Sequence, residues 1–104
     1  MNTAMKPVAP PLFDSVHLAR YTGGDPALRD ELLGLMCEQA HRCLAIMEAP
    51  SDPASWRAAC HPLQGAARGV GAFALADVCV VSELELEPSW PGSRTAVARC
   101  FHAT

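Results

Sequence analysis

Helix start and stop signals divide this chain at short intervals, and they constrain its fold more than any other feature. Asp25-Pro26 and Asp52-Pro53 each place a capping carboxylate before a proline that would occupy the first helical position. Gly23-Gly24 and Gly71 are typical of helix ends. Alanine and leucine dominate the intervals, and no alternating runs of β-branched residues occur, so the sequence predicts helices alone.

Five helices follow from these signals. They are a short one from Asp14-Ser15 to Arg20 or Tyr21, then 26–48, 53–69 and 72–87, and a last helix that Ser93 would cap. Four longer helices of about three to six turns, joined by short loops, predict an all-α fold, an up-and-down antiparallel four-helix bundle. The short N-terminal helix would lie across one end. We therefore expect a bundle domain at residues 14–104, preceded by a flexible, proline-rich arm at residues 1–13.

Size, charge and cysteine usage limit the possible functions. A chain of 104 residues fits one small domain and excludes most self-sufficient enzymes, including a kinase with its own nucleotide site. A formal charge of −3 argues against a nucleic-acid partner. No segment has the length of a signal peptide core or a membrane span. Five cysteines without a Cys-x-x-Cys pair are typical of buried thiols in a reducing compartment. We expect a cytoplasmic protein, and a monomer, because no long heptad seam is left over.

The third helix presents a polar face opposite its apolar stripe. At about 100° per residue, His61 projects away from the stripe, and Gln64, Gly65 and Arg68 lie within about 60° of it. The stripe itself consists of Trp56, Ala59, Cys60, Leu63, Ala67 and Val70. An exposed neutral imidazole is a good nucleophile near neutral pH. Gly65 leaves the ring open to a partner, and the Arg68 guanidinium could offset the charge of a phosphoryl group on it.

The stretch from His61 to Leu75 resembles the His-x-Leu-Lys-Gly signature of histidine-containing phosphotransfer (HPt) domains. Gly71, Ala72 and Leu75 also fit that family's pattern, which has a glycine about ten residues after the histidine, then a small residue and a leucine. The run from Leu18 to Leu33 is similar to the family's first two helices, so the resemblance covers about residues 14–87. The family is a four-helix bundle, which is the architecture expected above from spacing.

The resemblance implies a phosphorelay protein. In the family, the histidine accepts a phosphoryl group from an aspartate of one receiver domain and passes it to another. Here His61 would be the phosphoacceptor, with Gln64, Gly65 and Arg68 close to the phosphoryl group. The partners would be receiver domains of response regulators and a hybrid histidine kinase, and the chain would need no metal or other cofactor. It would be a phosphocarrier rather than an enzyme, with a small apolar docking patch beside His61.

Two residues depart from the family's pattern. Gln64 stands where the family usually has a lysine, and an amide brings no charge to the phosphoryl oxygens. Pro62 removes a backbone hydrogen bond and biases His61 away from helical angles, which predicts a kink or a helix restart. Two alternatives therefore stay open. One is a degenerate HPt-like module that docks a receiver without carrying phosphate, and the other is a structural helical bundle.

Two other groups of polar residues give no clear indication of a functional site. Cys37 and His41 lie four residues apart, but no further ligand completes a zinc site, so we expect a core cysteine and a surface histidine. Glu83, Glu85 and Glu87 alternate and do not share one helix face, which argues against a catalytic carboxylate pair. They are interpreted as the solvated end of a helix.

Overall fold

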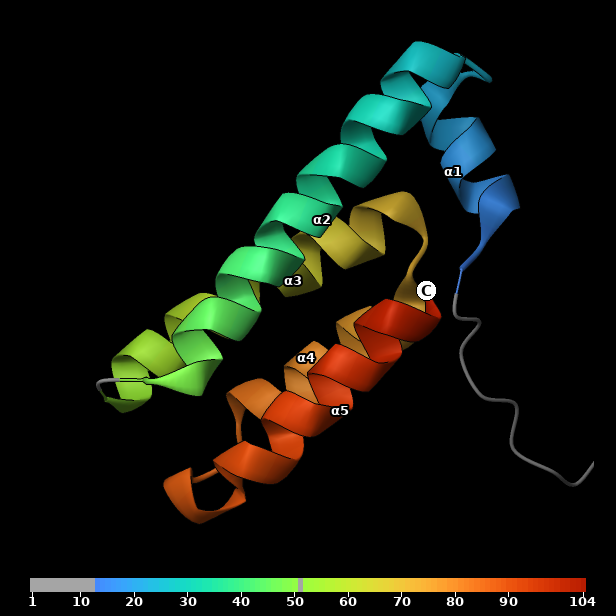
Figure 1. Cartoon of the computed structure of the whole chain (residues 1–104). Coiled ribbons are helices and arrows are strands. Elements are labelled where there is room, and N and C mark those ends of the chain that lie inside the picture. The colour runs from blue at the N-terminus through green and yellow to red at the C-terminus, as the bar shows by residue number, and fades with distance from the viewer. Residues whose placement is uncertain (1–12, 51) are drawn as a thin grey trace, which may run out of the picture.

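The computed structural model describes residues 13–50 and 52–104, and within these ranges the chain is all-α, as predicted (Figure 1). The elements are α1 (Ser15–Thr22), α2 (Pro26–Glu48), α3 (Pro53–Val70), α4 (Phe73–Glu83), the 3₁₀ helix η2 (Glu87–Ser89) and α5 (Trp90–Ala103). The predicted arm, except for Phe13, lies outside the described residues.

Carboxylate caps start the first three helices. Asp25 Oδ1 accepts a hydrogen bond from Ala27 N at 2.9 Å, and Asp52 Oδ1 accepts one from Ser55 N at 2.7 Å. Because the bond from Ser55 favours the ionised carboxylate, the pKa of Asp52 is lowered from its usual value. The starts predicted from the two Asp-Pro pairs are therefore confirmed.

The end of α4 and the start of α5 differ from the sequence prediction. α4 ends at Glu83 instead of residue 87, and α5 begins at Trp90, so Ser93 lies inside the helix it was expected to cap. Two indoles explain the early end, since Trp56 Nε1 donates to the Ser82 carbonyl at 2.7 Å and Trp90 Nε1 donates to the Glu85 carbonyl at 3.1 Å. They satisfy carbonyls that a longer helix would otherwise have bonded.

α3 runs through Pro62 as one helix, so the predicted restart is wrong. Trp56 before the proline and Leu63 after it are both buried, which shows that the apolar stripe stays continuous. The proline frees the carbonyl of Ala58, four residues earlier. Ala58 is exposed, so solvent can bond this carbonyl in place of the missing N–H.

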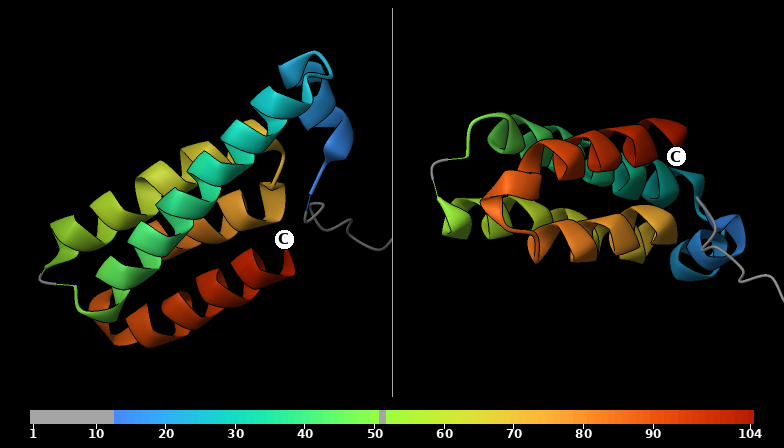
Figure 2. Two further views of the ribbon diagram at one scale, coloured as in Figure 1. Left: turned by 45° about the horizontal axis from the view of Figure 1, so that its top comes forward. Right: turned by 90° about the horizontal axis from the view of Figure 1, so that it is seen from below.

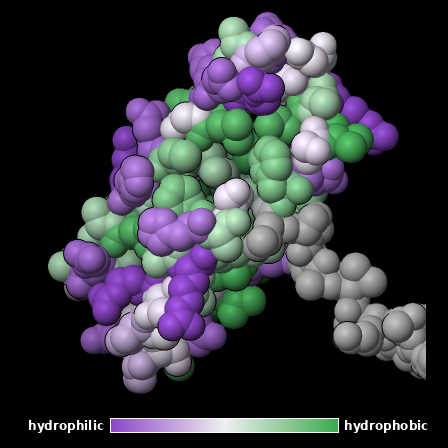
Figure 3. All heavy atoms as spheres, turned by 45° about the vertical axis from the view of Figure 1, so that its right-hand side comes forward, coloured by the Kyte–Doolittle hydropathy of each residue, from purple (hydrophilic) through white to green (hydrophobic). Residues whose placement is uncertain are grey.

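α2, α3, α4 and α5 pack in sequence around one core. α3 lies between α2 and α4, and α5 contacts both α4 and α2 (Figures 1 and 2). The face shown in Figure 3 has hydrophobic residues gathered at its centre and hydrophilic residues around them.

No helix in the described part of the chain has both the length and the apolar character that crossing a membrane requires.

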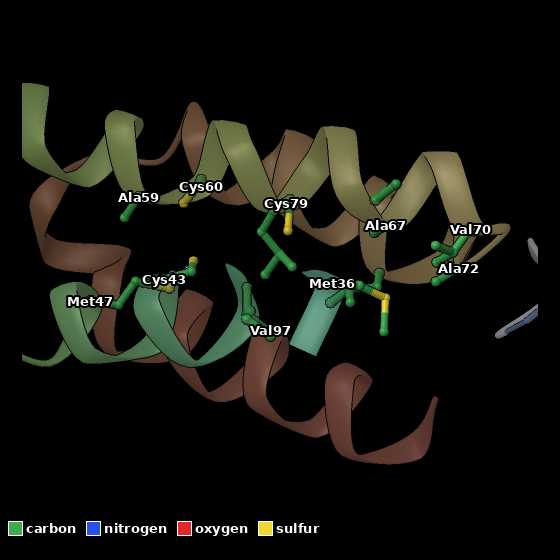
Figure 4. Packing of buried hydrophobic residues seen from close by; sticks show 14 of the residues in the cluster. Met36, Cys43, Met47, Ala59, Cys60, Ala67, Val70, Ala72, Cys79 and Val97 are labelled. Atoms are coloured by element: carbon green, nitrogen blue, oxygen red, sulfur yellow. Dashed lines mark hydrogen bonds between the residues drawn. The ribbon is translucent and has the colours of Figure 1, made fainter. Parts of the chain in front are cut away.

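The core contains thiols from several helices. Cys43, Cys60 and Cys79 come from α2, α3 and α4, and all three are fully buried (Figure 4). Burial raises the pKa of the Cys79 thiol to about 12. A hydrogen bond with Cys43, together with burial, raises the pKa of Cys60. These three cysteines are therefore small, buried core residues, as predicted.

A stacked tryptophan pair fixes one end of the core. The rings of Trp56 and Trp90 lie 4.6 Å apart at an interplanar angle of 7°. Trp56 belongs to α3, Trp90 begins α5, and the Trp56 indole also bonds α4 through Ser82. One buried contact thereby sets how α3, α4 and α5 lie relative to one another, and with them the side chains that α3 and α4 carry.

α1 is attached to the joint between α3 and α4. Asp14 N donates to the Gly71 carbonyl at 2.9 Å, and Leu18 of α1 is buried against the core. Gly71 has a φ of 88°, and a Cβ there would lie 2.7 Å from the Asp14 carbonyl oxygen. Only glycine fits this position without strain.

Candidate functional site around His61

His61 lies near the middle of α3 and points to solvent. Its side chain is 73% exposed, while Cys60 and Leu63 on either side of Pro62 are fully buried. The helical projection predicted this orientation, and the structure confirms it. An imidazole in this position can be reached by another protein without any movement of the helix.

Glu83, the last residue of α4, lies beside the His61 ring. Its Oε1 is 3.4 Å from His61 Nδ1, and its side chain is only 23% exposed. The interpretation of Glu83 as part of a solvated helix end is therefore wrong. Glu83 follows the buried Cys79 by four residues, so the helical period already placed it beside the buried face of α4.

Gln64 connects Glu83 to Arg68. With the amide oriented to satisfy both neighbours, Gln64 Nε2 donates to Glu83 Oε2 at 3.2 Å and Gln64 Oε1 accepts from Arg68 Nη1 at 3.3 Å. The two oxygens of one carboxylate thus hold the imidazole and the amide side by side. The structure brings His61, Gln64 and Arg68 together, as the projection predicted, and adds Glu83, which the sequence analysis missed.

Gly65 keeps the space beside the imidazole open. It is exposed, and a Cβ built on it meets no atom of residues 13–50 or 52–104 within 4 Å. Next to it lies a shallow hollow of about 200 Å³, bordered by Tyr21, Leu35 and Gly69. Tyr21 is 64% exposed and Leu35 is 48% exposed, so an apolar patch lies on the same side as Gly65, as expected.

This geometry determines which imidazole nitrogen is free to react. Glu83 Oε1 lies 3.4 Å from Nδ1, and a carboxylate on this side favours a neutral ring that carries its proton on Nδ1. Nε2 then keeps its lone pair and faces away from Glu83. The arrangement suits nucleophilic attack by Nε2 on an electrophile brought by a partner.

The Cys37–His41 pair forms no metal centre with its neighbours. Within residues 13–50 and 52–104, no three His, Cys, Asp or Glu side chains gather where they could hold a metal ion. His41 is exposed and packs edge-on against Phe101, with ring centroids 5.6 Å apart. Cys37 is half-buried against the core.

Comparison of the chain with protein-family models, with curated proteins and with solved structures finds no match. The resemblance to HPt domains therefore depends on the residues from His61 to Leu75 and on the helices before them.

Proposed function

We propose that this chain is an HPt-like phosphocarrier whose helices α2 to α5 form an up-and-down antiparallel four-helix bundle. The contacts of α3 with α2 and α4, and of α5 with α4 and α2, support this arrangement. The observation that carries the function is an exposed imidazole whose Nδ1 faces a carboxylate while a glycine leaves its surroundings open.

In the proposed step, Nε2 of neutral His61 attacks the phosphorus of an aspartyl phosphate in a receiver domain. The N–P bond forms, the P–O bond to the aspartate breaks, and the aspartate leaves as a carboxylate. The proton stays on Nδ1 throughout, and the Glu83 carboxylate beside it stabilises the positive charge that develops on the ring. Transfer to a second receiver is the same step in reverse, with the phosphoryl group passing from Nε2 to another aspartate.

The receiver would supply the magnesium ion and most of the transition-state stabilisation, so this chain would need neither a metal nor a nucleotide. Its own cation near the imidazole is Arg68, held through Gln64. The apolar hollow beside Gly65 would be part of the docking surface, with Tyr21 and Leu35 as its most exposed members. A hybrid histidine kinase would be the source of the phosphoryl group, and the carrier would act as a cytoplasmic monomer.

One observation favours a second candidate, a module that docks a receiver without accepting phosphate. Gln64 replaces the lysine that HPt domains usually have. The Glu83 carboxylate lies beside the His61 ring, and the neutral Gln64 amide does not compensate its negative charge. A phosphoryl group brings about two negative charges to the same place. The third candidate, a structural bundle, calls for a large exposed apolar stripe on a second helix face and for a buried or hydrogen-bonded His61. The 73% exposure of the His61 side chain favours the carrier, whereas the contact of its Nδ1 with Glu83 is compatible with both candidates.

Phosphoryl transfer from a panel of phosphorylated receiver domains tests the proposal. The variants are His61→Gln and, as a matched control, His41→Gln, which alters an exposed histidine on α2. Acid-labile label on the wild type and on His41→Gln, but not on His61→Gln, would support the carrier. Binding without label, unchanged in His61→Gln, would instead support the docking module.

A Glu83→Gln variant in the same assay separates positioning from acceptance. The amide can still face Nδ1 but carries no charge, so we expect label to accumulate more slowly, by about ten-fold or more. Equal rates in the variant and the wild type would show that Glu83 has no part in transfer.

A further inference from the structure

The groove between α4 and α5 is a second surface, apart from His61, and the proposed function does not use it. It has a volume of about 460 Å³ and follows two helices that lie side by side (Figure 2). Val78 and Val81 line it from α4, and Gly92 and Ala96 line it from α5.

The α5 wall of this groove consists of small residues. Gly92 and Ala96 are exposed and lie four positions apart, so they share one face of the helix. A Cβ built on Gly92 meets no atom within 4 Å. The low wall leaves room for another backbone to approach α5 closely.

Large apolar side chains are exposed at the α4 wall and just beyond it. Val81 is 59% exposed, and Leu84 and Leu86, which directly follow α4, are each 77% exposed. Only Val81 of these three lines the groove, and the two leucines follow it within five residues of the chain. Single exposed leucines are ordinary on a protein surface, but exposed apolar residues this close together are typical of a site of protein contact.

The charges along the groove are all of one sign. Asp77 and Glu85 line it, and among the residues that the structure describes no Lys, Arg or His lines it. Glu87 adds an exposed carboxylate in η2. A second copy of this chain that presented the same groove would bring like charges together, whereas a cationic partner would gain attraction and a faster association rate.

We propose that the α4–α5 groove binds an amphipathic helix of a partner protein, in which lysine or arginine residues flank an apolar stripe. The stripe would cover Val81 and lie against Gly92 and Ala96. The cationic side chains would reach Asp77 and Glu85 at the rim. This is the helix-in-groove mode of recognition, with anchors spaced one helical turn apart.

A labelled synthetic peptide of about 18 residues, with leucine and lysine at helical spacing, is the probe. A second peptide has glutamate in place of every lysine. Fluorescence anisotropy measures the affinity, and amide chemical shifts of the whole chain locate the site. We expect saturable binding of the lysine peptide only, with shifts at residues 77–85 and 89–96.

Two substitutions on the groove are compared with a matched one elsewhere. Val81→Ser is expected to weaken binding about five- to ten-fold, and Asp77→Asn about two- to five-fold with a smaller salt dependence. Val16→Ser, which alters an equally exposed valine of α1, should leave the affinity unchanged. All three positions are exposed, so folding should be retained, and far-UV circular dichroism checks this.

Three results would overturn the proposal. They are equal binding of both peptides, shifts that map to α2 and α3 around Leu35, and no binding of the lysine peptide at millimolar concentration. Concentration-dependent self-association that Val81→Ser abolishes would also overturn it, because the occupant would then be a second copy. None of these outcomes depends on phosphorylation of His61, so the proposal and the phosphocarrier function can fail separately.

Discussion

Replacing Gly65 should separate the stability of the domain from its proposed transfer activity. Glycine inside a helix is less favourable than alanine by about 0.5–1 kcal/mol. A Cβ at position 65 meets no atom within 4 Å, so no clash opposes this gain. Gly65→Ala should therefore raise the free energy of unfolding by about 0.5–1 kcal/mol, which is roughly 2–8 °C in Tm for a domain of this size.

A larger side chain at the same position should block docking. Position 65 follows His61 by one helical turn, so the two Cβ atoms would lie about 5–6 Å apart. We expect Gly65→Met to fold with at least wild-type stability and to accept phosphate from a receiver at least about ten-fold more slowly. Gly34→Met is the matched control, since Gly34 is also exposed and open, but lies on α2.

Urea denaturation followed by far-UV circular dichroism measures the stability, and the receiver assay measures the transfer. A loss of stability in Gly65→Ala would contradict the open surroundings of this residue. Transfer at the wild-type rate in a folded Gly65→Met would refute the reasoning that the glycine admits the partner to His61.

Three further predictions concern the core, one cap and the thiols. Trp56→Phe removes the donor to the buried Ser82 carbonyl and part of a buried ring. We expect it to lower the free energy of unfolding, measured by urea denaturation, by about 2–4 kcal/mol. A decrease smaller than about 1 kcal/mol would contradict this prediction. Because the folded pKa of Asp52 is lowered from 3.8, its charge adds stability above that pH, and this contribution is lost as the pH falls through the folded pKa. Unfolding free energies measured against pH should therefore fall more steeply in acid for the wild type than for Asp52→Asn, and parallel curves would show that the carboxylate has no such role. With a pKa of about 12, the Cys79 thiol is ionised in about one molecule in ten thousand at pH 8. Iodoacetamide should therefore label Cys37 in the native protein and Cys79 only in urea. Peptide mass spectrometry measures the labelling, and equal labelling rates for both cysteines in the native protein would contradict the burial of Cys79.

The helix starts could be predicted because their causes are local. Asp25 and Asp52 each bond backbone N–H groups within the next three residues, so the two Asp-Pro pairs contain the whole signal. The end of α4 could not be predicted in this way, because Trp56, which bonds Ser82, is 26 residues away in the sequence. The start of α5, by contrast, has a local signal that the Ser93 prediction passed over, since Pro91 stands in the first turn of this helix.

The residues of the candidate site could be predicted where they share one helix and could not where they come from another. His61, Gln64 and Arg68 share one face of one helix, and the helical period alone groups them. Glu83 belongs to another helix, and its place beside His61 depends on how α3 and α4 pack together. The helix predicted over 53–69 is present, and only the restart expected at Pro62 is wrong, because solvent can reach the carbonyl of Ala58 that the proline leaves without its N–H partner.

The bond between Asp14 and Gly71 gives α1 an anchor that uses only backbone atoms. Side chains at the exposed positions of α1 take no part in this bond, so a library of variants at Val16, Arg20 and Tyr21 should keep the helix in place. Gly71 should tolerate almost no substitution in the same library, since any side chain would push against the Asp14 carbonyl. α1 is therefore a segment on which new partner preferences can be selected while the rest of the domain stays unchanged.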